Sequence, residues 1–436
     1  MDKSTLEDLY DLFLAQGHVT TDSRNCKRGS IFFALRGDRF DGNQYVDQAL
    51  AGGCHVAVAD DPVLKGRDGV FFVDNALVAL QQLARYHRYQ LDIPIVGITG
   101  TNGKTTTKEL VSKVLAEKFN VYCTQGNLNN HIGVPLTLLS MNNSTEIGVV
   151  EMGANHVGEI ELLSAICKPN YGLITNIGYA HLEGFGSYEG VKTGKSELYR
   201  HIKSNDGILF VNSDDEVLME LSREMPRILY GKNDDGKCAV VGKNVSVNPF
   251  LAFEMDNQQT GEHLSVQTNL IGKYNIDNVL AAACIGVYFG LETSLIVRAL
   301  ENYNPTNNRS QLIDTQRNKV LMDAYNANPS SMQVAIENFA GIDHSRKILI
   351  LGGMKELGGT TVCEHQKLLE QIVQKEFNEV FLVGDEFRAL DIPPAYQWFA
   401  DVHALIVHLS ENPISGAFVL IKGSRGNKME LIQPIL

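Results

Sequence analysis

A glycine-rich stretch at residues 97–107 carries residue types that bind phosphate groups. It reads Gly-Ile-Thr-Gly-Thr-Asn-Gly-Lys-Thr-Thr-Thr. The backbone N–H groups of such a loop can wrap around phosphate oxygens, the lysine can reach the outer phosphates, and the next hydroxyl can bind Mg²⁺. The residues predicted to bind a nucleoside triphosphate are Gly100, Thr101, Asn102, Gly103, Lys104, Thr105 and Thr106.

The flanking sequence predicts the elements that hold this loop. Residues 93–98 form an apolar run typical of a buried parallel strand, and apolar residues recur at helical spacing in residues 108–115. The glycine spacing is shorter than in the common phosphate loop, because Ile98 stands where that pattern has a further glycine. A glycine-rich surface turn is the alternative, but the order of strand, loop and helix favours phosphate binding.

Further polar residues follow predicted strands, where the ligands of parallel sheets collect. Glu151 ends one strand, and a carboxylate beside a phosphate loop suits Mg²⁺, although it could equally cap the next helix. His181 follows the next strand, but a lone histidine is more often structural than a ligand. Lys192 and Lys195 lie beyond it, and on charge alone both are typical of solvated helix lysines.

Four polar residues in the second half of the chain are candidates for contacts with a nucleotide. Asn275 and Asn278 share one face at a predicted helix start, where their carboxamides suit either a purine edge or N-capping. Arg309 lies in a loop at a predicted domain boundary, and an arginine delivered from a second domain onto a γ-phosphate is a recurring arrangement. Asp323 closes a strand and could face the nucleotide.

The length and charge of the chain exclude some classes of protein. A chain of 436 residues should hold two to four domains. The formal net charge is −13, from 38 basic and 51 acidic residues. This balance argues against binding to nucleic acid or to an anionic membrane, where clustered cations supply the affinity.

Targeting signals and cysteine usage point to the cytoplasm. The longest apolar run, residues 279–291, is too short to span a bilayer, and the N-terminus lacks a basic region followed by an apolar core. The seven cysteines are widely spaced and form no Cys-x-x-Cys, which predicts free thiols rather than a disulfide framework or a structural zinc site. We expect a soluble cytoplasmic protein with no membrane span.

The alternation of apolar strands and amphipathic helices predicts an α/β fold in three domains. We expect a small N-terminal α/β domain at residues 1–90, a central phosphate-loop domain with a mostly parallel sheet at 91–305, and a C-terminal dinucleotide-fold-like (Rossmann-like) α/β domain at 306–436. Strands are predicted at residues 30–35, 55–59, 93–98, 147–151, 171–176, 207–211, 319–324, 347–351, 379–383 and 417–421. Helices are predicted at 6–14, 47–51, 156–166, 188–202 and 275–289, an antiparallel hairpin at 250–268, and exposed loops at 234–237 and 391–394.

These motifs, in this order, resemble those of the Mur ligase family of ATP-dependent amide-bond ligases. The resemblance extends over essentially the whole chain, and the short phosphate loop is the family's own form. Four stretches are most similar to members that add D-alanyl-D-alanine to a UDP-N-acetylmuramoyl-tripeptide in the cytoplasmic stage of peptidoglycan synthesis. They are residues 126–135, 151–154, 180–187 and 323–329.

The resemblance implies two Mg²⁺ sites. Thr105 and Glu151 would hold one ion, while His181 would hold the second together with Lys195. In this family the lysine at that position is carbamylated by CO₂, which turns an ammonium that cannot bind Mg²⁺ into an anionic oxygen ligand. We prefer Lys195 to Lys192 because it fits the family's Lys-x-Glu-aliphatic pattern.

The resemblance also assigns the remaining contacts. Asn275 and Asn278 would bind adenine, Arg309 the γ-phosphate and Asp323 the ribose of ATP. The residues expected to bind the other substrates are Ser23, Asn43, Asn129, Asn130, Tyr325 and Asn326, the first two within segments that resemble those gripping the uridine diphosphate. The chain departs from the family pattern in two places, with Tyr274 where many relatives have His and Gly353 where relatives often have Asp.

The resemblance implies that ATP phosphorylates the tripeptide carboxylate and that the dipeptide amine attacks the acyl phosphate. The catalytic residues would be Lys104, Lys195, His181 and Arg309. We expect a monomer that closes about a hinge near residues 304–310. One alternative is another ligase of the superfamily, either a tripeptide-forming ligase or one like folylpolyglutamate synthase, which lacks the uridine-nucleotide domain. The other is a nucleotide-dependent switch or transporter ATPase, which shares only the phosphate loop.

Overall fold

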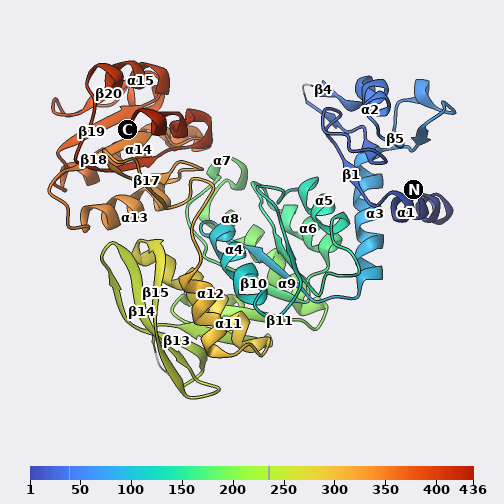
Figure 1. The fold of residues 1–436 in the computed structure, drawn as a ribbon, viewed down its shortest axis with the longest axis horizontal. Helices are drawn as coiled ribbons and strands as arrows, with labels where there is room; N and C mark the ends of the chain where they lie inside the picture. Colours follow the sequence, from blue (N-terminus) through green and yellow to red (C-terminus); the bar gives the residue numbers. More distant parts are fainter. Residues whose placement is uncertain (39, 234–235) are drawn as a thin grey trace.

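The computed structural model of the chain describes residues 1–38, 40–233 and 236–436. Three sheets follow one another along the sequence, and the first and last lie in lobes at opposite ends of the molecule, on either side of a central lobe (Figure 1). In these described ranges no helix has both the length and the apolar character needed to cross a bilayer. The predicted loop at 234–237 includes Asp234 and Asp235, which lie outside the described residues.

The N-terminal lobe is a parallel four-stranded sheet in the order β1-β2-β5-β6, with the β3–β4 hairpin beside it. The predicted strands at 30–35 and 55–59 are confirmed as β2 and β5, whereas β6 and α3 were not predicted. The elements are α1 (Lys3–Gln16), β1 (Val19–Thr20), β2 (Ile31–Phe33), β3 (Arg36–Gly37), β4 (Phe40–Asp41), α2 (Val46–Ala51), β5 (Val56–Ala59), β6 (Val70–Phe72) and α3 (Ala76–Leu91).

The central lobe contains a nine-stranded sheet in the order β15-β14-β13-β12-β11-β10-β7-β9-β8. Its strands are β7 (Ile95–Thr99), β8 (Val121–Cys123), β9 (Ile147–Glu151), β10 (Tyr171–Ile174), β11 (Ile208–Asn212), β12 (Arg227–Gly231), β13 (Cys238–Val247), β14 (Phe250–Asn257) and β15 (Glu262–Ile271). The first six are parallel, as predicted for a mostly parallel sheet. The predicted hairpin is confirmed as β14–β15, and β13 joins it as a further antiparallel strand that was not predicted.

The helices of the central lobe cover both faces of this sheet. They are α4 (Lys104–Leu115), α5 (Gly133–Leu139), α6 (Glu159–Cys167), α7 (Leu182–Phe185), α8 (Tyr188–Lys195), α9 (Glu197–Ser204), α10 (Glu216–Leu221), α11 (Ile276–Tyr288) and α12 (Thr293–Glu301). The single helix predicted at 188–202 is wrong, because it is divided at Ser196 into α8 and α9. There the Ser196 hydroxyl donates to the Thr193 carbonyl, and side-chain bonds of this kind compete with regular helix bonding.

The phosphate loop is held between a buried strand and a buried helix face. Every residue of β7 is buried, and β7 pairs with β10 on one side and β9 on the other. Leu110, Val111 and Val114 of α4 pack in one hydrophobic cluster with Val279 and Leu280 of α11. The loop therefore leaves a rigid part of the sheet and enters a helix that cannot shift easily.

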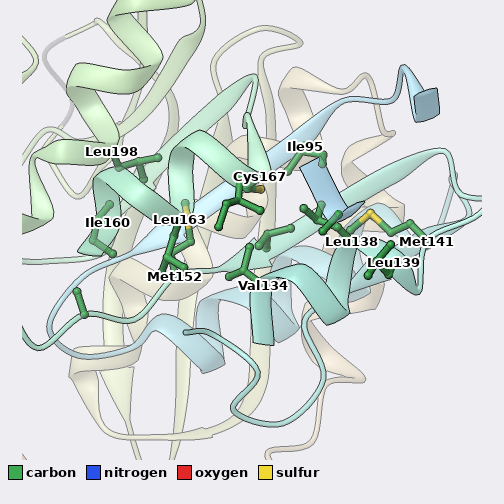
Figure 2. Close-up of a cluster of buried hydrophobic side chains, with 14 of the residues drawn as sticks. Ile95, Val134, Leu138, Leu139, Met141, Met152, Ile160, Leu163, Cys167 and Leu198 are labelled. Carbon is green, nitrogen blue, oxygen red and sulfur yellow. The ribbon is translucent and has the colours of Figure 1, made fainter. Parts of the chain in front are cut away.

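A second hydrophobic cluster lies on the opposite face of the sheet. Figure 2 shows members of this cluster spread along the face of the sheet, from Leu198 of α9 through Ile160 and Leu163 of α6 to Ile95 of β7 and Leu138 of α5. All five side chains are essentially inaccessible to solvent. Burial of each such side chain contributes about 1.5–3 kcal/mol to folding. The helices α5, α6 and α9 are therefore firmly packed against the part of the sheet that leads into the phosphate loop.

The C-terminal lobe is a six-stranded sheet in the order β16-β17-β21-β18-β19-β20, in which only β16 is antiparallel to its neighbour among the described strands. Its elements are β16 (Gln311–Asp314), β17 (Lys319–Asp323), α13 (Pro329–Ala340), β18 (Lys347–Gly352), α14 (Thr361–Val373), β19 (Glu379–Val383), β20 (Gln397–Phe399), α15 (Val402–Glu411) and β21 (Phe418–Lys422). The four strands predicted here are confirmed as β17, β18, β19 and β21. The domain boundaries at 90/91 and 305/306 stay a prediction.

The segment that links the central and C-terminal lobes is strained and anchored. Asn307, Asn308 and Ser310 all have positive φ, which non-glycine residues seldom adopt. The Tyr303 hydroxyl donates to a Glu109 carboxylate oxygen at 2.6 Å, and Asn307 Nδ2 donates to the other oxygen at 3.3 Å. Because Glu109 belongs to α4, the linker is fixed to the helix that follows the phosphate loop.

Replacing Arg88 with alanine should destabilise the junction between α3 and the central lobe. The buried Arg88 guanidinium donates to the carbonyls of Cys167 and Lys168 and to Asn170 Oδ1, at 3.0–3.2 Å. Its loss leaves buried acceptors without partners, at a cost of about 2–4 kcal/mol in the free energy of unfolding. Urea unfolding would measure this, with Arg85→Ala on the exposed face of α3 as the control. Equal losses in both variants would contradict the prediction.

Candidate active site

A cavity of about 870 Å³ lies between the central and C-terminal lobes. Most of the predicted site residues line it, although they come from segments far apart in the sequence. They are Thr101, Asn102, Gly103, Lys104, Thr105, Thr106, Asn129, Asn130, Glu151, His181, Asn275, Asn278, Arg309, Asp323, Tyr325 and Asn326. Gly100, Lys195, Ser23 and Asn43 are the predicted residues that are not part of this wall.

Two glycines of the phosphate loop have no room for a side chain. Gly100 has a φ of +142°, and a Cβ there would lie 2.0 Å from Thr175 Oγ1. Gly103 has a φ of +79°, and a Cβ there would lie 2.6 Å from Asn278 Oδ1. The loop passes so close to the end of β10 and to α11 that only glycine fits at these two positions, which accounts for their short spacing.

Lys104 begins α4 and turns its side chain back over the loop. Its ammonium donates to the carbonyls of Gly100 at 2.8 Å and Thr101 at 3.0 Å. Desolvation at the cavity wall lowers the pKa of Lys104 to about 8, with Glu151 opposing the shift and Arg309 reinforcing it. This cation is therefore held where negative charge on a phosphate would be stabilised most strongly.

Asn102, at the tip of the loop, is held by both lobes. Its N–H donates to Asn176 Oδ1 at 3.0 Å, and its carbonyl accepts from Thr175 Oγ1 at 2.6 Å. Across the cavity, Asn328 Nδ2 donates to Asn102 Oδ1 at 2.9 Å. Sequence reasoning did not single out Asn176 or Asn328, because only the folded chain brings them to the loop. Asn328 also caps α13, and its position before Pro329 was the available signal.

Glu151 has the environment of a cation ligand. It is 1% exposed at the end of β9, and its Oε1 accepts from Asn129 Nδ2 at 2.8 Å. Its Oε2 is buried without a hydrogen-bond partner, and both Glu151 and Thr105 line the cavity. A buried carboxylate oxygen without a donor is costly unless a cation neutralises it, so these residues fit a Mg²⁺ ion.

A Glu151→Gln substitution should therefore raise the Mg²⁺ concentration needed for half-maximal activity by roughly tenfold or more. The amide keeps the shape of the side chain and can still accept from Asn129, but it removes the negative charge. Activity measured against Mg²⁺ concentration would show the shift. Glu161→Gln, on the exposed face of α6, is the control and should leave the curve in place.

The two candidate lysines of α8 have different surroundings. Lys192 is partly exposed, and its ammonium lies 3.8 Å from a Glu220 carboxylate oxygen. Lys195 is 2% exposed, and its Nζ donates to the carbonyl of Ala154 at 3.2 Å. Because Ala154 lines the cavity, Lys195 lies directly behind the cavity wall.

The site around Lys195 disfavours a charged ammonium. Its Nζ lies 5.2 Å from the centre of the Phe185 ring. Burial, and secondly the ammonium of Lys104, lower the pKa of Lys195 well below that of an exposed lysine. The neutral amine, which is the form that reacts with CO₂, is therefore favoured.

His181 precedes α7 and is paired across the lobes. Its Nδ1 forms an ion pair with the Glu356 carboxylate, which belongs to the loop after β18. The bond to His181 holds the pKa of Glu356 below its usual value. In the described ranges no group of three or more His, Cys, Asp or Glu side chains forms a metal cluster.

The carboxamides of Asn275 and Asn278 are bonded to each other and to their neighbours. Asn278 Nδ2 donates to Asn275 Oδ1 at 3.0 Å, and Thr107 Oγ1 donates to Asn278 Oδ1 at 3.0 Å. Asn275 Nδ2 donates to the carbonyl of Ile271 at 2.9 Å, so its side chain does not cap α11. Asn278 Nδ2 has a second N–H bond that could serve a ligand. Their contact with adenine stays a prediction.

Tyr274, one of the two departures from the family pattern, lines the cavity beside these asparagines. Its side chain is half-buried, and desolvation raises the pKa of its hydroxyl. The hydroxyl lies 2.6 Å from Ser310 Oγ in the linker. Tyr274 therefore adds a contact to the segment that carries Arg309.

Arg309 and Tyr325 meet at the C-terminal side of the cavity. The Arg309 guanidinium lies 3.7 Å from the centre of the Tyr325 ring, and its Nε is buried without a hydrogen-bond partner. Asp323 accepts from Lys422 Nζ at 2.5 Å and from the Ser310 N–H at 3.3 Å. Arg309 is thus held by its ring contact and has an N–H group to offer an anion.

Four of the predicted substrate-binding residues also have structural partners. Asn130 Oδ1 accepts from the N–H groups of Ile132 and Gly133 before α5, and the Asn326 carbonyl lies 3.5 Å from Lys422 Nζ. In the N-terminal lobe, Asn43 Nδ2 donates to Asp41 Oδ1 and Asp60 Oδ1, so both its N–H bonds are used. The Ser23 carbonyl accepts from the Cys26 thiol. Substrate binding by all of these residues stays a prediction.

Gly353, the second departure, lies beside a buried carboxylate. A Cβ at Gly353 would lie 2.3 Å from Glu386 Oε2, an oxygen that is buried without a hydrogen-bond partner. The other oxygen of Glu386 is paired with Lys355. An aspartate at position 353 could be accommodated only if Glu386, from the segment after β19, moved.

Comparisons with known proteins account for this arrangement. Residues 17–88 match the family model described as Mur ligase family, catalytic domain, residues 98–286 match the Mur ligase middle domain, and residues 308–425 match the Mur ligase, glutamate ligase domain. The UDP-N-acetylmuramoyl-tripeptide–D-alanyl-D-alanine ligase of Bacillus subtilis is 33% identical over 433 residues, which cover 95% of this chain and 92% of that protein. The chain belongs to the Mur ligase family.

Solved structures of Mur ligases share the fold over nearly the whole chain. MurF from Acinetobacter baumannii superposes with a TM-score of 0.85 at 30% identity, covering 96% of this chain and 92% of that one. MurF from Thermotoga maritima, solved in complex with ADP, gives 0.85 at 27% identity, covering 98% and 97%. The predicted three-domain α/β fold and family are confirmed.

Proposed function

We propose that the chain is the ATP-dependent ligase that adds D-alanyl-D-alanine to a UDP-N-acetylmuramoyl-tripeptide in the cytoplasmic stage of peptidoglycan synthesis. The observation that carries the proposal is the cavity between two lobes. It brings together the phosphate loop, the unpartnered carboxylate oxygen of Glu151 and the Arg309 guanidinium. Relatives of nearly the same length carry this activity in their names.

The reaction needs two anions to approach each other, because the γ-phosphoryl group of ATP must reach the tripeptide carboxylate. Lys104 from the phosphate loop and Arg309 from the linker offset this repulsion from opposite sides of the cavity. The acyl phosphate formed in this step is then attacked by the amine of the dipeptide, and phosphate leaves. Enclosure between two lobes protects the acyl phosphate from water.

Two Mg²⁺ ions, one held by Thr105 and Glu151 and the other by His181 and a CO₂-derived carbamate on Lys195, would neutralise phosphate charge in this cavity. The neutral amine that burial favours at Lys195 supports the carbamate assignment. The Ala154 carbonyl orients the Lys195 side chain toward the back of the wall, and Asn129 orients Glu151.

We assign the N-terminal lobe to the uridine diphosphate end of the tripeptide substrate. Its polar loops carry paired charges beside short strands. Arg24 bonds to Asp22 and lowers the pKa of that carboxyl to about 2, and Arg36 bonds to Asp41 and Asp60. The cavity that we assign to ATP is lined by residues from 101 to 422, so the two nucleotides bind in separate places.

The alternatives fit less well. A ligase like folylpolyglutamate synthase lacks the uridine-nucleotide domain, whereas residues 17–88 of this chain match a Mur ligase model. A nucleotide-dependent switch or transporter ATPase would need the phosphate loop but not a second lobe that delivers Arg309 to it. A tripeptide-forming Mur ligase is the remaining competitor, and it differs in the amine that it accepts.

Phosphate release by the purified protein, supplied with ATP, Mg²⁺ and a UDP-N-acetylmuramoyl-tripeptide, tests the proposal. Release should depend on added D-alanyl-D-alanine and should be matched by formation of the UDP-linked pentapeptide, detected by mass spectrometry. Single D-amino acids and diamino acids serve as competing acceptors. Phosphate release that does not depend on the dipeptide, or a preference for a single amino acid as the acceptor, would overturn the assignment.

A further inference from the structure

An ion pair between His181 and Glu356 joins two loops that are 175 residues apart in the sequence. His181 follows β10 in the central lobe, and Glu356 follows β18 in the C-terminal lobe. Both residues have left-handed backbones, with φ values of 51° and 61°. Non-glycine residues seldom adopt this conformation unless their surroundings impose it, and such strain gathers at functional sites.

The contact between these loops extends beyond the ion pair. A Cβ at Gly358 would lie 3.8 Å from Glu183 Cβ, so the two loops touch over several residues. The His181 side chain is 22% exposed and lines the cavity, whereas the Glu356 side chain is 54% exposed and is not part of the cavity wall. Glu356 thus approaches the imidazole from outside the cavity.

This geometry determines which ring nitrogen of His181 a ligand can use. When His181 is neutral, the Glu356 carboxylate can only accept a hydrogen bond from Nδ1–H, so Nδ1 carries the hydrogen and the lone pair is left on Nε2. Histidines that bind metal ions commonly donate their other N–H to a carboxylate, which fixes both the tautomer and the ring orientation. Here the carboxylate comes from a different lobe than the histidine.

We propose that Glu356 is a positioning residue that prepares His181 for the second cation of the site, so that this cation is bound well only when the C-terminal lobe is in place. The inference rests on the proposed function for the identity of the cation. A consequence is that the cation site is completed at the same time as the lobes close. In an open molecule His181 would lose its carboxylate and favour the tautomer with hydrogen on Nε2.

Nitrogen NMR of protein labelled at its 12 histidines tests the tautomer without any substrate. A His181→Gln variant identifies the signal. The wild-type protein should show hydrogen on Nδ1 of His181, and Glu356→Ala should move the signal toward the Nε2–H form. Glu356→Gln should keep the wild-type tautomer, because an amide oxygen still accepts a hydrogen bond. An unchanged signal in Glu356→Ala would overturn the proposal.

Binding of Mn²⁺ in the presence of ADP, measured by calorimetry, tests the cation site without turnover. Glu356→Ala should weaken one of two binding events by about 10–100-fold and leave the other unchanged. The control is Asn338→Ala, which removes another contact between the lobes, the 2.9 Å bond from the Lys273 N–H to Asn338 Oδ1. Equal weakening in both variants would mean that Glu356 merely holds the lobes together, and would overturn the proposal.

The two proposals can fail separately. If phosphate release by the wild-type chain did not depend on the dipeptide, the proposed function would be wrong. The tautomer measurement would still decide the role of Glu356. If turnover depended on the dipeptide but the Mn²⁺ isotherm of Glu356→Ala matched the wild type, only the positioning role would be overturned.

Discussion

Lys195→Ala should lower the rate of dipeptide-dependent phosphate release by about 10³-fold, equivalent to about 4 kcal/mol in the activation free energy. The substitution removes the buried amine behind Ala154 that we assign as the group converted by CO₂ into an anionic oxygen ligand. Steady-state turnover at saturating substrates measures the effect. Added formate or acetate should restore part of the activity, because a small carboxylate can enter the space that the lysine leaves.

Lys192→Ala provides the matched control for this experiment. Lys192 lies on the same helix, three residues earlier, but it is partly exposed, and its ammonium lies 3.8 Å from a Glu220 carboxylate oxygen. Its loss should leave turnover close to that of the wild type. Near-normal activity of Lys195→Ala, with an unchanged melting temperature, would contradict the carbamate assignment.

Arg309→Ala should reduce the turnover number by roughly 10³-fold while changing ATP affinity much less. The Arg309 guanidinium faces the cavity from the linker, and its buried Nε has no hydrogen-bond partner in the described structure. Such a group stabilises charge that develops during phosphoryl transfer more than charge already present in bound ATP. Equilibrium binding of ATP and single-turnover rates would separate the two effects.

A comparison with Arg425→Ala isolates the role of Arg309 from its packing. Arg425 lies 5.5 Å from the centre of the same Tyr325 ring, but it is exposed and is not part of the cavity wall. Its loss should have little effect on turnover. A loss in ATP affinity as large as the loss in turnover for Arg309→Ala would mean that Arg309 binds the nucleotide without acting on the transition state.

The parts of the fold that the sequence predicted well are those whose signal is local. The parallel strands β7, β9, β10 and β11 are fully or largely apolar runs, and each is bounded by polar or glycine-rich residues. Two other strands of this sheet were harder to predict. The second half of β13 alternates half-buried and exposed residues, and the edge strand β8 has three half-buried residues, so neither carries a strong apolar signal.

The candidate site was predictable residue by residue, but its internal bonds were not. Lys104, Glu151 and Arg309 could be proposed from residue type and position alone. The bonds from Asn129 to Glu151, from Asn328 to Asn102 and from His181 to Glu356 join distant segments. No periodicity in the chain encodes such contacts. They follow from the crossing order of the strands and from the approach of one lobe to another.

The division of the cavity wall between two lobes has a consequence for inhibitors. A compound bound there would touch Lys104 and Glu151 on one side and Arg309 and Tyr325 on the other. Movement of the lobes apart would break one of these two sets of contacts. Compounds that span both sides should therefore favour the closed arrangement of the lobes.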